Sequence, residues 1–234
     1  MIRRLIVAIG VLSPILALSA YGTAGATSAG STAAAGWLVQ APSVPVTVAT
    51  ARFTVPPVTC GVVENSAAFD TVAVNALNGG FLVLDTHIID ACVDGVALYE
   101  AAGIGHPFTM TISPGDIVVL RSSYGPPGTH ALQSSVDDLT SGVSQKRTGS
   151  YAGSHPVVSA FVGIETSNSQ SDVSDFGTVR WSKATVNGES LGLLAELPYV
   201  RFVMKRIKPK RVLVSTGNLS SSGSGFTNTW ETGH

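Results

Sequence analysis

Charged residues are scarce in this 234-residue chain. Asp, Glu, Lys and Arg together make up 12% of it, and the formal net charge is −1. A chain without an excess of basic residues has no overall electrostatic attraction to nucleic acid. It holds only two cysteines, and no further His or Cys residues follow them at the spacing of a metal site. We therefore expect no nucleic-acid partner, no metal and no cofactor.

Helical periodicity is also missing. No segment longer than about ten residues repeats its apolar positions with the helical period of about 3.6, and no internal repeat is present. Short Val- and Thr-rich runs alternate instead with turn residues, as at Ser113–Asp116, a type II turn sequence between expected strands at 109–112 and 117–121. Only Leu191–Glu196 suits a single helical turn. The pattern predicts an all-β, two-sheet antiparallel β-sandwich in one domain, residues 36–234.

Only one apolar run is long enough to concern a membrane, and it lies at the N-terminus. Arg3-Arg4 precedes the run Leu5–Leu18, and an Ala-x-Ala cleavage motif ends at Ala26. We interpret residues 1–26 as a signal peptide of a secreted, extracellular protein, with an uncleaved membrane anchor as the alternative. Residues 27–35 contain only Thr, Ser, Ala and Gly, which predicts a flexible N-terminal segment.

The two cysteines are Cys60 and Cys92. An even number of cysteines in an exported chain favours a disulfide. It would close a loop of about 30 residues and contribute on the order of 3–4 kcal/mol in the chain-entropy model. Two free buried thiols, or two ligands of an incomplete metal site, are the alternatives.

Glu165 ends an apolar run that begins at Val157. It is the only ionisable residue of that run, and a carboxylate at the end of a buried strand is unfavourable unless it is paired or functional. Glu165 is therefore the first candidate for a functional residue.

Six short motifs follow one another along the chain: Phe53–Pro56, Ala97–Glu100, Ile112–Asp116, Asp138–Gly142, Ala160–Glu165 and Phe176–Val179. In this order they resemble motifs of the glutamic peptidases (eqolisins). Over roughly residues 33–230 the resemblance implies that family's concave pair of antiparallel sheets, a polypeptide substrate bound in the concave face, and Glu165 as catalytic base. Many bacterial members also carry a cysteine pair where Cys60 and Cys92 lie.

The chain departs from the family at the second catalytic position. The family pairs its Glu with a Gln, but counting back from Cys92 puts Asp85 there, and a slip of one or two residues puts Thr86 or His87 there. An Asp85–Glu165 pair can work only by sharing a proton, which predicts weak activity confined to acid pH. The first hypothesis is thus a secreted acid endopeptidase with Glu165 and Asp85 as catalytic residues.

The second hypothesis is a catalytically inactive, exported β-sandwich that binds a polymer, a peptide or an anionic surface. A Ser/His/Asp site through His87 is a further alternative. We expect a monomer in either case.

Five basic residues within seven positions form the one strong charge cluster. One interpretation is a solvated edge strand whose pairing Pro209 interrupts. The other is attachment to an anionic surface. The basic residues are Lys205, Arg206, Lys208, Lys210 and Arg211.

Overall fold

The computed structural model describes ten stretches of the chain. Among these residues, no helix is both long and apolar enough to cross a membrane. The predicted signal peptide lies outside them. The described residues are 27–31, 33–40, 45–61, 66–76, 82–125, 131–150, 157–166, 173–194, 199–207 and 210–231.

The described residues are mostly strand, and their only helical element is the 3₁₀ turn η1 (Leu191–Leu193). The strands are β1 (Thr27–Ser31), β2 (Ala34–Gln40), β3 (Val48–Thr54), β4 (Ser66–Ala76), β5 (Leu82–Val93), β6 (Val96–Gly103), β7 (His106–Pro107), β8 (Ile117–Tyr124), β9 (Ala131–Asp138), β10 (Val143–Ser150), β11 (Val157–Glu165), β12 (Thr178–Val186), β13 (Glu189–Ser190), β14 (Tyr199–Arg206), β15 (Arg211–Thr216) and β16 (Phe226–Trp230).

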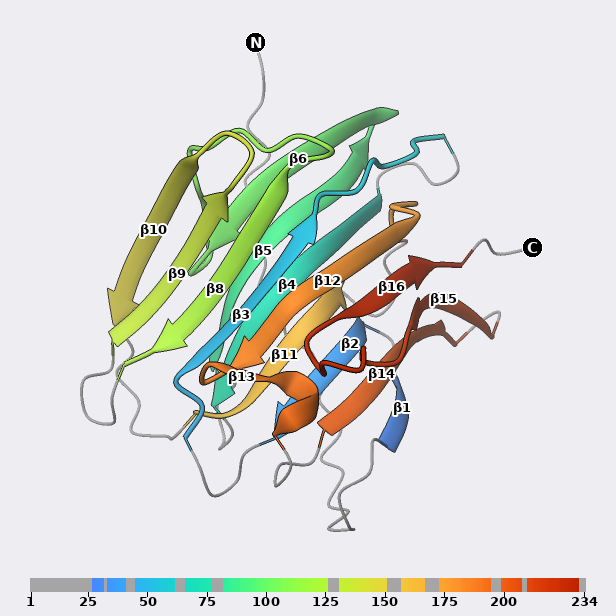
Figure 1. The fold of residues 1–234 in the computed structure, drawn as a ribbon. Helices are drawn as coiled ribbons and strands as arrows, with labels where there is room; N and C mark the ends of the chain where they lie inside the picture. The colour runs from blue at the N-terminus through green and yellow to red at the C-terminus, as the bar shows by residue number, and fades with distance from the viewer. Residues whose placement is uncertain are drawn as a thin grey trace.

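The strands form one continuous hydrogen-bonded path that folds into two packed layers (Figure 1). Its order is β10-β9-β8-β3-β12-β16-β15-β14-β2-β11-β4-β5-β6-β7. Strands β3, β8 and β9 contact β4, β5, β6 and β11 across the interior. All pairs along this path are antiparallel, and only β1 runs parallel to its neighbour β14. The predicted all-β antiparallel sandwich is confirmed.

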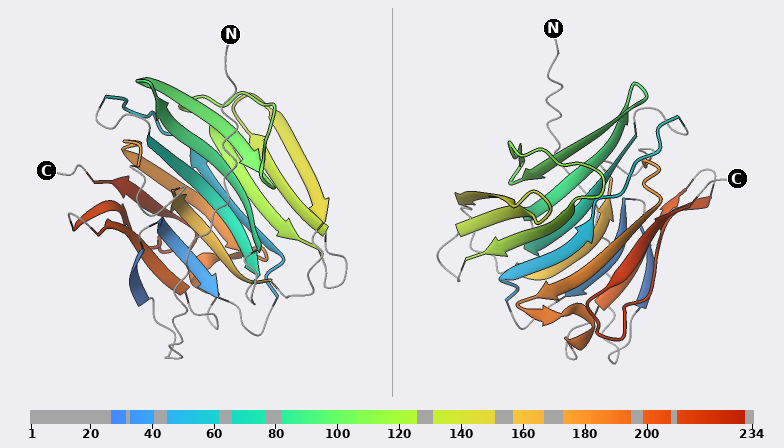
Figure 2. Two further views of the ribbon diagram at one scale, coloured as in Figure 1. Left: turned by 180° about the vertical axis from the view of Figure 1, so that it is seen from behind. Right: turned by 45° about the horizontal axis from the view of Figure 1, so that its top comes forward.

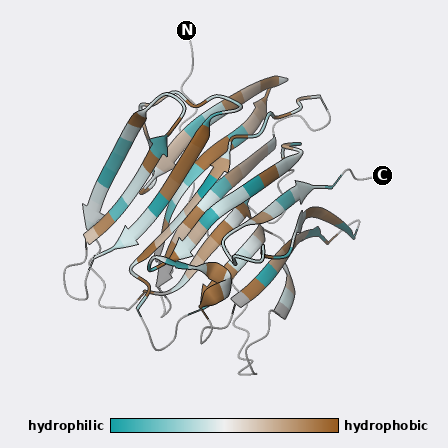
Figure 3. Ribbon diagram, in the orientation of Figure 1, coloured by the Kyte–Doolittle hydropathy of each residue, from teal (hydrophilic) through white to brown (hydrophobic). Residues whose placement is uncertain are grey.

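The main core lies between the layers because the strands alternate in polarity (Figure 3). In β3, for example, Ala49, Ala51 and Phe53 are buried while their neighbours are partly exposed. The Phe53 ring packs 4.7 Å from the Trp181 ring, centroid to centroid. The Trp181 indole N–H donates to Asn228 Oδ1 at 2.8 Å, which satisfies the one polar group of this buried ring.

Two local predictions differ from the structure, and some strands were not predicted. The segment expected to be flexible contains β1 and the start of β2, because small residues still pair through their backbones. No strand forms at 109–112. Strands β6 and β10 were not predicted. Strand β10 is a polar edge strand without apolar alternation, so its sequence gives no period-2 signal.

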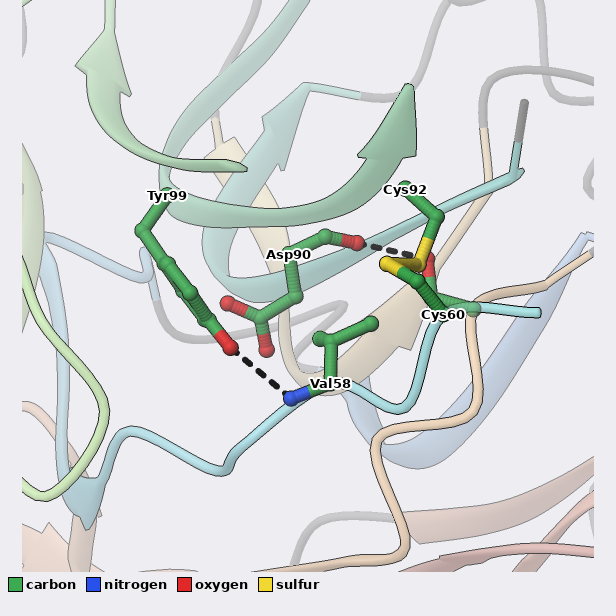
Figure 4. The surroundings of a disulfide bond; sticks show 6 residues. Val58, Cys60, Asp90, Cys92 and Tyr99 are labelled. Carbon is green, nitrogen blue, oxygen red and sulfur yellow. Dashed lines mark hydrogen bonds between the residues drawn. A yellow bond between two sulfur atoms is a disulfide. The ribbon is translucent and has the colours of Figure 1, made fainter. Parts of the chain in front are cut away.

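The predicted disulfide is present between Cys60 and Cys92, whose Cα atoms lie 5.6 Å apart. It ties the chain that follows β3 to strand β5 (Figure 4). Nearby, the Val58 backbone N–H donates to the Tyr99 hydroxyl at 2.8 Å. The bond and this hydrogen bond hold one end of the sandwich together.

Two glycines face each other where β2 meets β11. Gly36 and Gly163 are cross-strand partners with φ of +156° and +158°. A Cβ on Gly163 would lie 2.2 Å from the Ala35 carbonyl oxygen and 2.8 Å from Cζ of the Phe161 ring. The absence of side chains at both positions therefore lets Phe161 lie over the sheet, on the same face as Glu165 and four residues before it.

Replacing Gly163 with alanine is expected to destabilise the protein by about 3 kcal/mol or more. The new Cβ would meet fixed backbone atoms rather than a flexible side chain, and the positive φ adds strain. Urea unfolding measures the loss. Gly149→Ala is the control, because its Cβ meets only Ile104 at 3.4 Å, and it should stay within about 0.5 kcal/mol of wild type. Equal unfolding midpoints for Gly163→Ala and wild type would contradict this packing.

Candidate functional site

Polar side chains gather on one face of three neighbouring strands, β11, β4 and β5. Glu165 pairs with Phe69, Thr71 with His87, and Ala73 with Asp85. Because side chains on paired strands alternate in step, Glu165, Thr71, His87 and Asp85 all lie on the same face. Seen from behind, these strands lie side by side in their layer (Figure 2, left).

Thr86 shows which face this is. Its hydroxyl lies 2.8 Å from the Ser122 hydroxyl and donates to the Arg121 carbonyl at 2.9 Å, both on β8 of the opposite layer. Thr86 therefore points into the sandwich, and its neighbours Asp85 and His87 point away from it. We call the group Asp85, His87, Thr71 and Glu165 the outer-face cluster.

Asp85 and His87 form a direct pair. His87 Nδ1 lies 2.7 Å from Asp85 Oδ2, and the two side chains are 11% and 19% exposed, His87 first. The Phe69 ring meets the imidazole edge to face, with centroids 5.3 Å apart. With Nδ1 committed to Asp85, Nε2 is the ring nitrogen left for other partners.

The charges in this pair stabilise one another. Burial alone would lower the pKa of His87, but the charge and hydrogen bond of Asp85, with smaller contributions from Glu165 and Glu100, raise it above its ordinary value. Burial alone would raise the pKa of Asp85, but the charge and hydrogen bond of His87 lower it. The favoured state is an imidazolium beside a carboxylate.

The pKa of the Glu165 carboxyl is raised, whereas that of the Asp85 carboxyl is lowered. Burial raises its pKa to about 7, and the nearby Asp85 charge adds to the rise. The His87 charge and a hydrogen bond from Thr71 only partly offset it. A carboxyl with a pKa near neutrality can hold or release a proton under ordinary conditions, as a general base must.

An apolar patch continues from this cluster across β14, β2, β11 and β4. Its buried members Leu38, Ala73 and Phe161 form a hydrophobic cluster separate from the main core. Ala34, Val200 and Phe202 pack against them. Ala34 is the cross-strand partner of Glu165, so the patch begins directly beside the carboxyl.

The structure brings together the two predicted site residues but not in the predicted way. Asp85 and Glu165 lie on the same face, with His87 between them. The charge of Asp85 raises the pKa of Glu165, and the charges of Asp85 and Glu165 both raise the pKa of His87. The shared-proton interpretation is corrected, because Asp85 is bonded to His87 and its pKa falls rather than rises. His87 was considered as a register slip or as part of a Ser/His/Asp site, but not as the partner of Asp85, although its i, i+2 spacing from Asp85 was the available signal.

The basic run lies in the β14–β15 hairpin. Both strands have neighbours on each side along part of their length. The basic residues lie at the end of the hairpin, where Lys205 pairs with Val212 and Arg206 with Arg211. Lys205 and Lys210 are exposed, Arg206 and Arg211 are half-buried, and Lys208 lies outside the described residues.

No family model matches the chain, and a search of curated proteins finds no match. Solved structures do share its fold. Scytalido-glutamic peptidase, crystallised with a transition state analog inhibitor, superposes with a TM-score of 0.64 at 17% identity, covering 85% of this chain and 98% of that one. SCP-B, a member of the eqolisin family in complex with the tripeptide Ala-Ile-His, gives 0.60 at 17%, covering 85% and 100%. Aspergilloglutamic peptidase from Aspergillus niger gives 0.50 at 22%, covering 71% and 99%. The chain therefore has the fold of the glutamic peptidases.

A second pair of carboxyls lies on the opposite face of the same strands and was not predicted. Asp70 and Asp90 are fully buried, and no other group among the described residues hydrogen-bonds to their carboxyl oxygens. Burial raises the pKa of Asp70 to about 7, and burial plus the Asp70 charge raises the pKa of Asp90 well above its ordinary value. Two ionised carboxylates only accept hydrogen bonds and repel each other, so the buried pair must hold at least one proton. Asp90 lies between Tyr99 and the disulfide (Figure 4).

This pair should make the protein less stable as pH rises. Its contribution is complete below the unfolded-state pKa of about 3.9 and is lost as pH rises through the folded-state value of about 7 for Asp70. The slope is about 1.4 kcal/mol per pH unit for each such group. Asp70→Asn should flatten the decline in stability, because the amide N–H of the new side chain donates to the Asp90 carboxylate at any pH and no titratable proton is needed.

Urea unfolding at a series of pH values tests this expectation. The control is Asp94→Asn, an exposed turn residue, which should follow the wild-type curve. An Asp70→Asn curve parallel to wild type would show that the buried pair is not the source.

Proposed function

We propose that this chain is an endopeptidase that hydrolyses peptide bonds with Glu165 as general base. The observation that carries the proposal is the Glu165 carboxyl itself, which has a pKa raised to about 7 beside an ion pair and an apolar patch. Support also comes from the solved structures of the same fold, which bind a peptide-based transition state analog and a tripeptide.

In the proposed reaction the Glu165 carboxylate takes a proton from a water molecule, whose oxygen attacks the peptide carbonyl carbon. The carbonyl π electrons move to oxygen and form a tetrahedral oxyanion. As the oxyanion collapses, the C–N bond breaks and the Glu165 carboxylic acid returns its proton to the leaving nitrogen. The products are one new carboxyl end and one new amine end.

The polypeptide substrate is proposed to lie along the apolar patch, where Leu38, Phe161 and Phe202 offer contacts for its side chains. The N-terminal sequence and the Cys60–Cys92 bond support secretion, since disulfides persist in oxidising compartments. The exposed Lys205 and Lys210 are proposed to contact anionic surfaces.

Glu165→Gln is expected to lower peptide cleavage by about 100-fold or more, because an amide cannot take a proton from water. Folding should be unaffected or improved at neutral pH, since the variant removes a carboxyl with an unfavourable burial term. The measurement is cleavage of casein and of a peptide library near neutral pH.

Glu189→Gln is the matched control, because it makes the same carboxylate-to-amide substitution at an exposed residue. Cleavage that survives in Glu165→Gln would remove Glu165 as the base. A folded wild type that binds peptides without cutting them would favour the binding-protein hypothesis instead.

A further inference from the structure

The outer-face cluster lacks a neutral donor for the oxyanion. The side chain at position 85 is a carboxylate, which would repel a developing negative charge. The Thr71 hydroxyl has a single proton, and that proton already has two acceptors nearby, the Phe69 carbonyl at 3.0 Å and the Glu165 carboxyl. Hydrolysis through Glu165 nevertheless requires a donor aimed at the oxyanion.

We infer that His87, as an imidazolium held by Asp85, is a catalytic residue that stabilises the oxyanion through its Nε2–H. The inference rests on the proposed function, because it assigns a partner to Glu165 in the same reaction. Asp85 is then a positioning residue that acts through His87 and does not touch the substrate.

The geometry fixes which nitrogen does this. Nδ1 donates to Asp85 at 2.7 Å, and the Phe69 ring holds the imidazole from the side. Rotating the ring to free Nδ1 would break a charge-assisted hydrogen bond, which is about twice as strong as a neutral one. The remaining donor of the ring is therefore Nε2–H, and it exists as a fixed group before any substrate arrives.

The charges around the ring keep it protonated. The groups that act on His87 are Asp85 on its own strand, Glu165 on β11 and Glu100 on β6, and all three are acidic. Their combined effect opposes the burial that would otherwise strip the proton. Positive charge at His87 in turn favours the ionised form of Glu165.

The reaction therefore needs two groups in opposite states, Glu165 without its proton and His87 with its proton. Glu165 loses its proton around pH 7, and His87 keeps its proton above its ordinary range. Activity should peak near neutrality and fall on both sides. At about pH 4 Glu165 holds its proton and no base is present, so the acid-limited profile expected from an Asp85–Glu165 pair does not follow from this geometry.

The experiment compares profiles of kcat/KM against pH, from about pH 4 to 10, for wild type, His87→Leu, His87→Gln and Asp85→Asn. Wild type should give a bell. His87→Leu should lose about 100-fold or more, mainly in kcat, because the donor is gone. His87→Gln should keep activity and lose only the alkaline fall, since an amide donor does not titrate. Asp85→Asn should move the alkaline fall to lower pH.

His106→Gln, an exposed histidine of β7, is the matched control and should leave the profile unchanged. If Glu165→Gln abolishes cleavage while His87→Leu stays within about twofold of wild type, the inference fails and the proposed function stands. If neither variant alters cleavage, both fail.

Binding of a phosphinate peptide, which carries an anionic tetrahedral centre, tests the inference without turnover. Calorimetry at about pH 6 and about pH 9 should show tight binding by wild type at the lower pH, and weaker binding at the higher pH and in His87→Leu. Binding that is absent, or equal in wild type and His87→Leu, would overturn the role of His87 whether or not cleavage is seen.

Discussion

The register of strands β11, β4 and β5 is the constraint on which the site depends. It places Glu165, Thr71, His87 and Asp85 on one face although they come from three strands. A slip of one residue between β4 and β5 would turn the Asp85–His87 pair into the interior. The Cys60–Cys92 bond, which ties β5 to the chain that follows β3, acts against such a slip.

The same strands carry acidic residues on both faces, and the two faces stabilise them by different means. On the outer face Asp85 is balanced by the His87 charge, so the carboxylate stays ionised. On the inner face no described residue other than Asp70 and Asp90 themselves balances their charge, so a bound proton takes the place of the cation. Because His87 lies beside Asp85, the Asp85–His87 pair is charged and can take part in a reaction. The Asp70–Asp90 pair has no such histidine and affects only stability.

The fold was predictable because alternation and turn residues report on each strand separately. Glu165 was recognisable as a candidate because it is the only ionisable residue of an apolar run. The Cys60–Cys92 bond was predictable from the even number of cysteines in a chain expected to be exported. Strands β1 and β10 were not predictable, since neither has an apolar face. The role of His87 and the buried pair depend on register, which fixes the residues opposite each strand and cannot be derived from one strand's pattern.

An NMR titration of the ¹⁵N-labelled ring of His87 in the folded protein tests whether Asp85 holds His87 as an imidazolium beside an ionised Glu165. We expect that the pKa of His87 lies above its ordinary value of about 6.5, that the neutral ring keeps its proton on Nδ1, and that Asp85→Asn lowers the pKa. A pKa of His87 at or below the ordinary value that Asp85→Asn leaves unchanged would contradict this expectation.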